Sequence, residues 1–481
     1  MTVLTFLKII SIIIAFVGTS FLFPIGTAAA LGETVVLPSF IIPMIASWIA
    51  AAIIFIAGRK HTIRLSTRGT FVIVAVAWVS VSLFGAAPLY FSGAIPHFAD
   101  AVFESVSGIS TTGATILNEV ESLPRSINLW RCETHWLGGM GIVALTVALL
   151  PLLGVGGFQL IKAETTGPEK GKVTPKITTT AKILWATYAV LTVLQLILLM
   201  VAGMDFIDAL SHAFATLGTG GFSTRNTSVG AYNSATIDII CTVFMVIAGV
   251  NFSLYYYAVI RKFSEIRENT ELKVYIGIFF VAALLLALLT MQQYGSFFRA
   301  FRYSSFQSAA ILTTTGFATA DFTTWVPVAQ LIIFLLYFIG GCAGSTGGGI
   351  KVIRWIVLTK QVHNETKKLL HPHGIFNIRL NGKVASKGLV LNIAAFISLY
   401  FLLVMITAAI GCLFNLDIFS SLTGALSMVG NVGPAFNKLG PSCNYGFLPD
   451  TVKWWYSFAM LAGRLELYTM IIYFLPAYWK K

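Results

Sequence analysis

Four short segments of the chain align with one another without a gap, and each ends in glycine after a short apolar run. They are ESVSGISTTG (104–113), HAFATLGTGG (212–221), QSAAILTTTG (307–316) and GALSMVGNVG (424–433). Their first position varies among Glu104, His212, Gln307 and Gly424, whereas the second is always small. The terminal glycines lie 108, 95 and 117 residues apart. Such self-similarity at a nearly fixed period predicts one structural unit of roughly a hundred residues, used four times.

The composition excludes an ordinary soluble protein. Of the 481 residues, 57% are hydrophobic and 11% are charged, whereas roughly 25% are charged in a typical soluble domain. Apolar spans are predicted at 4–23, 35–57, 70–91, 128–153, 180–202, 234–260, 272–291, 325–362 (interrupted), 386–412 and 452–477. Each is near or above the ~20 residues that a helix needs to cross a bilayer. The sequence therefore predicts an all-α polytopic membrane protein with ten crossings, the first retained rather than cleaved as a signal peptide.

An apolar span precedes and follows each aligned segment, which gives the pattern helix, pore loop, helix four times around one central pore. Residues 98–109 and 206–217 are too few to cross the membrane but are enough for re-entrant half-helices. The C-terminal end of such a half-helix carries partial negative charge and favours a cation near the membrane centre. The predicted units are 1–60 (two extra N-terminal transmembrane helices), 61–162 (repeat 1), 163–265 (repeat 2), 266–370 (repeat 3, with an intramembrane glycine loop) and 371–481 (repeat 4).

Lysine and arginine are concentrated in one set of loops. These loops, at 59–68, 162–182, 261–273, 351–387 and 480–481, carry 23 Lys and Arg against six Glu. The opposite set carries seven Lys and Arg against twelve Asp and Glu. By the positive-inside rule, the first set and both termini are predicted to be cytoplasmic, so all four aligned segments fall on the outer side. The formal net charge of +13 is thus a topology signal, and no nucleic-acid partner is predicted.

The tetrapeptides that end the four segments are suited to holding a cation. They are Ser110-Thr111-Thr112-Gly113, Gly218-Thr219-Gly220-Gly221, Thr313-Thr314-Thr315-Gly316 and Gly430-Asn431-Val432-Gly433. Glycine reaches positive φ without steric cost, which lets consecutive carbonyls turn toward one axis. One such tetrapeptide is typical of a loop or a helix C-cap, but four predict a selectivity filter whose backbone carbonyls replace the hydration shell of K⁺. No cofactor other than this ion is predicted for the chain.

A glycine-rich stretch interrupts the eighth apolar span. GGCAGSTGGG (340–349) has six glycines in ten residues, and each glycine costs a helix roughly 1 kcal/mol relative to alanine. We predict an unwound loop that gates permeation beneath the filter. A stripe of small residues for close helix packing is the alternative. A phosphate-binding loop is disfavoured, because the glycines are not followed by the required GK[ST] ending.

Arg464 lies midway along the last apolar span. A guanidinium there must face protein or water and is a functional candidate by default. We predict that it points into the pore near the glycine loop as a fixed positive barrier; the alternative is a structural ion pair with an acid on another helix. Glu466 is assigned a buried structural role. The predicted gate residues are Gly344, Ser345, Thr346, Gly347, Gly348, Gly349, Lys351 and Arg464.

Together these features resemble the TrkH branch of the bacterial TrkH/KtrB/HKT superfamily of potassium transporters. The resemblance covers essentially the whole chain. It is carried by the four tetrapeptides, WRCETHWLGGMGI (130–142), GTGGFSTRN (218–226), GGCAGSTGGGIK (340–351) and AGRLELYT (462–469). Glycine ends all four tetrapeptides, which matches the K⁺-selective pattern of the family. The fourth departs from the threonine-rich style at Asn431-Val432.

The resemblance implies specific partners and a location. In the family, two chains form a homodimer, and the cytoplasmic face docks a ring of RCK-type subunits (TrkA) that bind ATP/ADP or NAD(H). We therefore expect a homodimer in the lipid of a bacterial inner membrane. The basic loops 162–182 and 351–387 are predicted to form the docking face, because the chain has no regulatory domain of its own. The family also implies the gating roles given to 340–349 and Arg464.

A secondary symporter and an enzyme are the alternatives to a K⁺-selective pore. A secondary symporter, moving K⁺ with Na⁺ or H⁺, needs binding residues at discontinuous helices near the midplane, and the stretch 340–349 fits that description. Against it, the four segments share one orientation, and midplane carboxylates other than Glu466 are lacking. An enzyme is not predicted, because no nucleophile–base set or metal-ligand spacing occurs, and the five cysteines show no pairing pattern.

Overall fold

The computed structural model describes residues 3–58, 67–141, 177–381, 383–384, 387–465, 467–471 and 476. Within these residues the chain is built from helices and loops, with one short hairpin in which β1 (Arg379–Leu380) pairs antiparallel with β2 (Lys383–Val384). The all-α fold predicted from the sequence is confirmed. The basic loop 162–176, the predicted repeat boundary at 162 and Glu466 lie outside the described residues.

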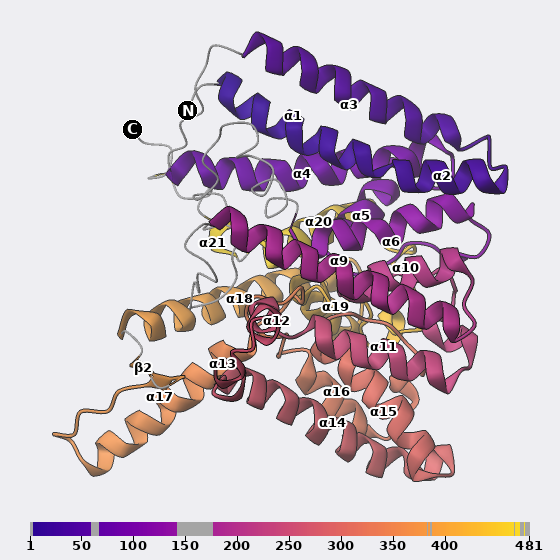
Figure 1. Ribbon diagram of the computed structural model, residues 1–481. Coiled ribbons are helices and arrows are strands. Elements are labelled where there is room, and N and C mark those ends of the chain that lie inside the picture. Colours follow the sequence, from indigo (N-terminus) through magenta and orange to yellow (C-terminus); the bar gives the residue numbers. More distant parts are fainter. Residues whose placement is uncertain are drawn as a thin grey trace.

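The N-terminal helices pack together at one end of the molecule. They are α1 (Val3–Ser20), α2 (Leu22–Leu31) and α3 (Leu37–Ala57). Figure 1 shows α1, α3 and α4 (Thr67–Phe91) lying side by side. The chain turns at Phe21 between α1 and α2, so the first apolar span continues past residue 23, where the sequence analysis ended it, as far as Leu31.

Each repeat contains a long first helix, a short pore helix and a second helix. The first helices are α4, α9 (Ile177–Val201), α14 (Thr270–Tyr294) and α18 (Lys387–Leu413). The pore helices are α5 (Phe98–Ile109), α10 (Phe206–Leu217), α15 (Phe297–Leu312) and α19 (Ile418–Gly430). The second helices are α6 (Arg125–Gly139), α11 (Ala235–Ala248), α16 (Pro327–Leu336) and α20 (Asp450–Arg464). The remaining helices are α12 (Phe252–Val259), α13 (Phe263–Arg267), α17 (Val352–Leu370), α21 (Tyr468–Ile471), η2 (Ser228–Tyr232), η3 (Phe322–Thr324) and η4 (Asn437–Leu439).

Six helices in the described part of the chain are long and apolar enough to cross a membrane. They are Phe6–Leu31, Leu37–Ala57, Phe71–Phe91, Ala181–Val201, Thr270–Tyr294 and Gly388–Leu413. These six correspond to spans predicted from the sequence. The other four predicted spans are the ones that follow the aligned segments, and there the second helices end after 10 to 15 residues.

The uninterrupted crossing predicted at 234–260 is wrong. Its two halves, α11 and α12, meet at an angle of 93° around residues 249–251. Asn251 begins α12 by accepting a hydrogen bond from the N–H of Ser253 with its side chain, as an N-cap does. The interruption predicted in 325–362 is confirmed, because α16 and α17 are separated by residues 337–351. In the last span, α20 ends at Arg464, which is therefore a helix terminus rather than a mid-helix residue.

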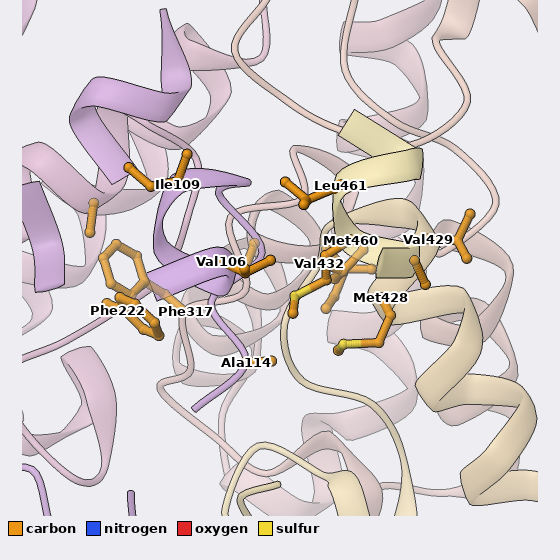
Figure 2. Close-up of a cluster of buried hydrophobic side chains, with 14 of the residues drawn as sticks. Val106, Ile109, Ala114, Phe222, Phe317, Met428, Val429, Val432, Met460 and Leu461 are labelled. Atoms are coloured by element: carbon orange, nitrogen blue, oxygen red, sulfur yellow. The ribbon is translucent and has the colours of Figure 1, made fainter. Parts of the chain in front are cut away.

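Three of the four pore helices begin at polar caps, and each pore helix packs on the second helix of its repeat. Asp205, Ser296 and Asp417 accept hydrogen bonds from the first free N–H groups of α10, α15 and α19, which satisfies donors that a helix start otherwise leaves unpaired. Figure 2 shows buried apolar side chains contributed by all four repeats, with Val432 and Met460 next to one another. At the periphery, α17 and the hairpin extend away from the helical body (Figure 1).

Candidate functional site

The four tetrapeptides adopt the same backbone conformation. Each begins at the C-terminal end of its pore helix. The second residue is left-handed in every copy, with φ between 54° and 60° at Thr111, Thr219, Thr314 and Asn431. The terminal glycine is also left-handed, with φ between 74° and 98° at Gly113, Gly221, Gly316 and Gly433. A left-handed residue with a side chain costs about 1–2 kcal/mol, so three threonines and an asparagine held in this region indicate a backbone that its surroundings impose.

The tetrapeptides form a closed ring. A Cβ added to Gly113 would come much closer than 3.0 Å to the carbonyl oxygen of Gly220 in the next repeat. The same relation holds from Gly221 to Thr315, from Gly316 to Val432 and from Gly433 back to Thr112. Each terminal glycine therefore lies against a carbonyl oxygen of the following tetrapeptide, with no room for a side chain. The structure brings all four sequence-predicted tetrapeptides to one place.

All four terminal glycines line a shared cavity with a volume of about 550 Å³. Its wall also includes Arg131, Arg225 and Asp321. Of these, Asp321 accepts hydrogen bonds from Thr323 and Ser442. The cavity therefore adjoins the ring of tetrapeptides and has charged side chains in its wall.

The first, variable position of the aligned segments has a common structural use that the sequence analysis did not assign. Glu104 accepts hydrogen bonds from the hydroxyl of Thr115 (2.9 Å) and the N–H of Ile116 (3.0 Å). His212 bonds the hydroxyl of Ser223 (2.9 Å), and Gln307 donates to the carbonyl of Ala320 (2.9 Å). In three repeats, a side chain of the pore helix therefore holds the segment that leaves the tetrapeptide.

In repeat 1, the pore-helix side chain that holds the segment after the tetrapeptide is part of a buried ion pair. Arg131 donates to the Glu104 carboxylate at 2.6 and 2.9 Å, and both side chains are almost fully buried. The guanidinium also lies over the ring of Phe222, 4.4 Å from its centroid. Because Glu104 also accepts from two groups after the tetrapeptide, its carboxylate is fully engaged. Removing one partner of such a pair leaves a buried uncompensated charge, which costs about 3–5 kcal/mol.

A charged network surrounds the start of α10 beside the cavity. Asp208 is buried and accepts hydrogen bonds from Arg125 (3.2 Å), Arg225 (3.0 Å) and the Tyr232 hydroxyl (2.8 Å). Burial raises the pKa of the Tyr232 hydroxyl, so Tyr232 remains a proton donor to this carboxylate. The network fixes the loop after the second tetrapeptide to its own pore helix.

The fourth tetrapeptide reaches the ring by different means. Gly430 is the last residue of α19, whereas Ser110, Gly218 and Thr313 are the C-caps just beyond their pore helices. The side-chain amide of Asn431 donates to the Thr112 hydroxyl and to the carbonyl of Met460, both at 2.9 Å. The carbonyl of Gly433 accepts from the hydroxyls of Ser427 and Tyr445, both at 2.8 Å. In the first and third tetrapeptides, two hydroxyls bond to one another. The fourth has no such pair, and the Asn431 amide instead joins it to repeat 1 and to α20 of its own repeat.

The glycine-rich stretch 340–349 is an irregular loop bonded to the tetrapeptide of its own repeat and to repeat 2. The N–H of Gly348 donates to the Thr314 hydroxyl at 2.6 Å, which joins the loop to the third tetrapeptide. The N–H of Cys342 donates to the carbonyl of Gly249 (2.8 Å), and the N–H of Phe252 donates to the carbonyl of Gly344 (3.0 Å). These bonds hold the loop in the bend between α11 and α12. Lys351 donates to the carbonyl of Gly347 within the loop.

The structure brings Arg464 to this loop. Its guanidinium donates to the carbonyl of Thr346 at 2.7 Å and to the carbonyls of Gly138 and Gly139 at 2.9 and 3.1 Å. A single side chain at the end of α20 therefore connects repeat 4 to the end of α6 in repeat 1 and to the loop of repeat 3. Of the predicted gate residues, Ser345 bonds within the loop, with its hydroxyl donating to Cys342.

Glu271 is a site residue that sequence reasoning missed. It lies in the first turn of α14 and is buried. Its carboxylate accepts from the N–H of Ala343 (2.8 Å) and from the N–H of Ile353 (3.0 Å). One carboxylate thus clamps the chain both within the glycine-rich stretch and just beyond it. The available signal was an acid at the start of an apolar span, but its partners lie 72 and 82 residues away.

The fold and this site define a class of protein: a multi-pass helical membrane protein with four pore segments closed into one ring. A family model described as "TrkH: Cation transport protein" matches residues 37–481. The chain belongs to the TrkH family of cation transport proteins. The resemblance found in the sequence is thereby confirmed. So is the prediction that the chain is not an enzyme, since the family is one of transporters.

Relatives with known names agree with this membership. The Trk system potassium uptake protein TrkH of Halomonas elongata is 38% identical over 435 residues, covering 89% of this chain and 90% of that protein. The protein of the same name from Escherichia coli K12 is 37% identical, covering 88% of both. The crystal structure of the potassium transporter TrkH from Vibrio parahaemolyticus matches with a TM-score of 0.89 at 32% identity and covers 100% of both chains.

Proposed function

We propose that this chain takes up K⁺ across a bacterial inner membrane through a selectivity filter made by the four tetrapeptides. The observation that carries the proposal is the closed ring, in which four tetrapeptides with the same pattern of left-handed residues set carbonyl oxygens against the glycines of the neighbouring repeat. Backbone carbonyls that replace a hydration shell favour K⁺. The four pore helices end at this ring, and their C-terminal partial charges favour a cation there.

The charge pattern of the loops supports an orientation. With the basic loops in the cytoplasm, the 550 Å³ cavity is the outer mouth, and the glycine-rich loop lies on the cytoplasmic side of the filter. K⁺ enters the cavity, loses water at the ring and passes the loop. Transport from outside to inside then requires that the loop and Arg464 move or yield.

Gating is assigned to the loop 340–349 and Arg464 under the control of a cytosolic RCK-type, nucleotide-binding subunit. The support is local: the loop bonds to the third tetrapeptide through Gly348, to the α11–α12 bend through Cys342, and to Arg464 through Thr346. A force applied to α12 from the cytoplasmic side is transmitted to the loop through the bonds at the α11–α12 bend. A force on α17 reaches the loop along the chain, because α17 begins at Val352, just after the loop. A homodimer would present two such surfaces to the partner ring.

Glu271 provides a test of the loop as a gate. Glu271→Ala removes the acceptor for the N–H groups of Ala343 and Ile353, and unsatisfied buried donors cost about 1–3 kcal/mol each. We expect the loop to loosen and basal K⁺ flux, without the partner, to rise severalfold. Glu271→Gln is the matched control, because its amide oxygen can accept the same bonds, and its flux should stay near the parent value. Equal flux in all three proteins would argue against the loop as the barrier.

The docking surface is tested by charge reversal. Lys170, Lys172 and Lys176 are assigned to it from sequence alone. Changing the three to glutamate should weaken co-purification with an RCK-type subunit, and the defect should depend on salt, because exposed charges are screened within about 8–10 Å at moderate ionic strength. Lys438→Glu, in the opposite set of loops, is the control. Association that survives the triple change at every salt concentration would place docking elsewhere.

Ion flux measured with the purified protein distinguishes a channel from a symporter. The protein is reconstituted into lipid vesicles, and Rb⁺ or K⁺ uptake is measured with and without an opposing Na⁺ or H⁺ gradient. A selective pore follows the K⁺ electrochemical gradient alone. Uptake driven against that gradient by Na⁺ or H⁺ would support the alternative, a K⁺/Na⁺ or K⁺/H⁺ symporter.

A further inference from the structure

The second tetrapeptide lacks the side-chain bonding found in the first and third. In the first, the hydroxyls of Ser110 and Thr112 lie 2.7 Å apart, and in the third those of Thr313 and Thr315 also lie 2.7 Å apart. These pairs join the first and third residues of their tetrapeptides. The equivalent residues of the second tetrapeptide are Gly218 and Gly220, which have no side chain to offer.

Backbone conformation does not require either glycine. Gly218 has φ −68°, and Gly220 is not among the residues with positive φ. Both positions are instead crowded by one residue, His135 of α6. A Cβ on Gly220 would collide with the imidazole ring, and a Cβ on Gly218 would collide with the His135 carbonyl. Glycine is therefore needed at 220 because the His135 imidazole occupies the space, and at 218 because the backbone carbonyl of the same residue does.

His135 is bonded at both ring nitrogens. The N–H of Phe222 donates to Nε2 at 3.1 Å, and Nδ1 lies 2.8 Å from the carbonyl oxygen of Gly108. Because Nε2 accepts, the proton of the neutral ring is on Nδ1, which donates to Gly108. The side chain is fully buried, and its ring centroid lies 4.2 Å from that of Phe222. One imidazole thus connects the pore helix of repeat 1 to the residue that follows the second tetrapeptide.

We propose that His135 is a positioning residue for ion selectivity, which takes the place of the missing hydroxyl pair and holds the second tetrapeptide in the ring. The inference rests on the proposed function of the ring as a K⁺ filter. The residue acts through the backbone of 218–222 and does not touch the ion. Selectivity at the second tetrapeptide is therefore set by a helix of the first repeat.

Two near-isosteric substitutions test the two hydrogen bonds of the His135 ring one at a time. His135→Gln places an amide oxygen close to the Nε2 position and retains an acceptor for Phe222. His135→Asn places an amide N–H close to the Nδ1 position and retains the donor to Gly108 but does not reach Phe222. We expect Gln to keep most of the K⁺/Na⁺ permeability ratio and Asn to lower it severalfold, with similar melting temperatures. Permeability ratios come from reversal potentials in planar bilayers.

The contact with Gly220 gives a second, independent test through a double-mutant cycle. Gly220→Ala alone forces a methyl group into the imidazole and should lower the permeability ratio. His135→Ala alone leaves the tetrapeptide unsupported and should lower it as well. In the double variant, the methyl group fills space that the ring has vacated, so the combined loss should be clearly smaller than the sum of the two single losses.

Leu129→Ala is the control for loss of volume, because Leu129 is a buried residue of the same helix. It should lower the melting temperature without changing the permeability ratio. Additive losses in the cycle, together with equal ratios for Gln and Asn, would overturn the role of His135. If Gly113→Ser changes selectivity in the same preparations, the filter assignment stands even though the His135 proposal fails. If neither Gly113→Ser nor the His135 variants change the permeability ratio, the assignment of the ring as the filter is wrong as well.

Discussion

Replacement of Gly113, Gly221 or Gly316 by serine is expected to reduce the K⁺/Na⁺ permeability ratio by about tenfold or more. The added Cβ meets a carbonyl oxygen of the neighbouring tetrapeptide, and that oxygen is one of the ligands that we propose for the ion. The left-handed backbone adds about 1–2 kcal/mol of strain for a residue with a side chain. A differential loss of about 1.4 kcal/mol between K⁺ and Na⁺ already corresponds to a factor of ten. Reversal potentials under mixed K⁺ and Na⁺ gradients measure the ratio.

Backbone strain alone has a matched control. Gly203 also has a left-handed backbone, with φ of 103°, but no atom lies within 4 Å of the position its Cβ would take. Gly203→Ser should therefore lower stability slightly and leave selectivity unchanged. We expect a smaller loss of the permeability ratio for Gly433→Ser. A Cβ on Gly433 would lie 2.6 Å from the Thr112 oxygen, which is a milder collision than in the other three. An unchanged ratio in all four filter variants would contradict the assignment of the ring as the filter.

The pore helices were predictable because local rules determine them. The predicted segments 98–109 and 206–217 match α5 and α10 residue for residue. Each is an apolar run too short to cross a membrane, and the following glycine-containing turn ends it. The aligned segments also fixed which residues would meet, because four copies with the same local conformation close most simply around one axis.

The bend between α11 and α12 could not be found in the same way. Residues 234–260 read as one apolar span, and periodicity gives no reason to break it. The bend is stabilised by bonds from Gly249 and Phe252 to Cys342 and Gly344 of the glycine-rich loop, which lies far away in the sequence. The local signs were Gly249 and Asn251, a glycine followed two residues later by an N-cap. They acquire meaning once the loop is known to pack there.

The supporting residues were missed for a related reason. His135, Glu271 and Glu104 all bond to backbone N–H groups, and such partners leave no mark in the residue types of the partner segment. His135 reaches Phe222, 87 residues away. A polar residue that is buried in a helix must have a hydrogen-bond partner, but the sequence does not show which residue that partner is. The glycines at 218 and 220 were visible in the sequence, but only the structure shows that Gly220 makes room for the imidazole of His135 and Gly218 for its backbone carbonyl.

Arg464→Ala is expected to raise basal K⁺ flux by at least about tenfold and to reduce its dependence on the cytosolic partner. A fixed positive charge repels a cation far more strongly in a low-dielectric passage than in water, and lowering a barrier by about 1.4 kcal/mol gives a tenfold higher rate. The same substitution releases the carbonyl of Thr346 in the loop and those of Gly138 and Gly139. Rb⁺ uptake into vesicles without the partner measures the effect.

Two further variants separate charge from tethering. Arg464→Lys keeps the positive charge but loses the planar fork that reaches three carbonyls at once; low flux in this variant assigns the barrier to charge, and high flux assigns it to the tether. Lys453→Ala is the control on the same helix, because Lys453 is a buried cation paired with Asp100 and its loss should reduce stability without opening the path. Folded Arg464→Ala protein with flux at or below the parent value would exclude both roles and favour a purely structural one.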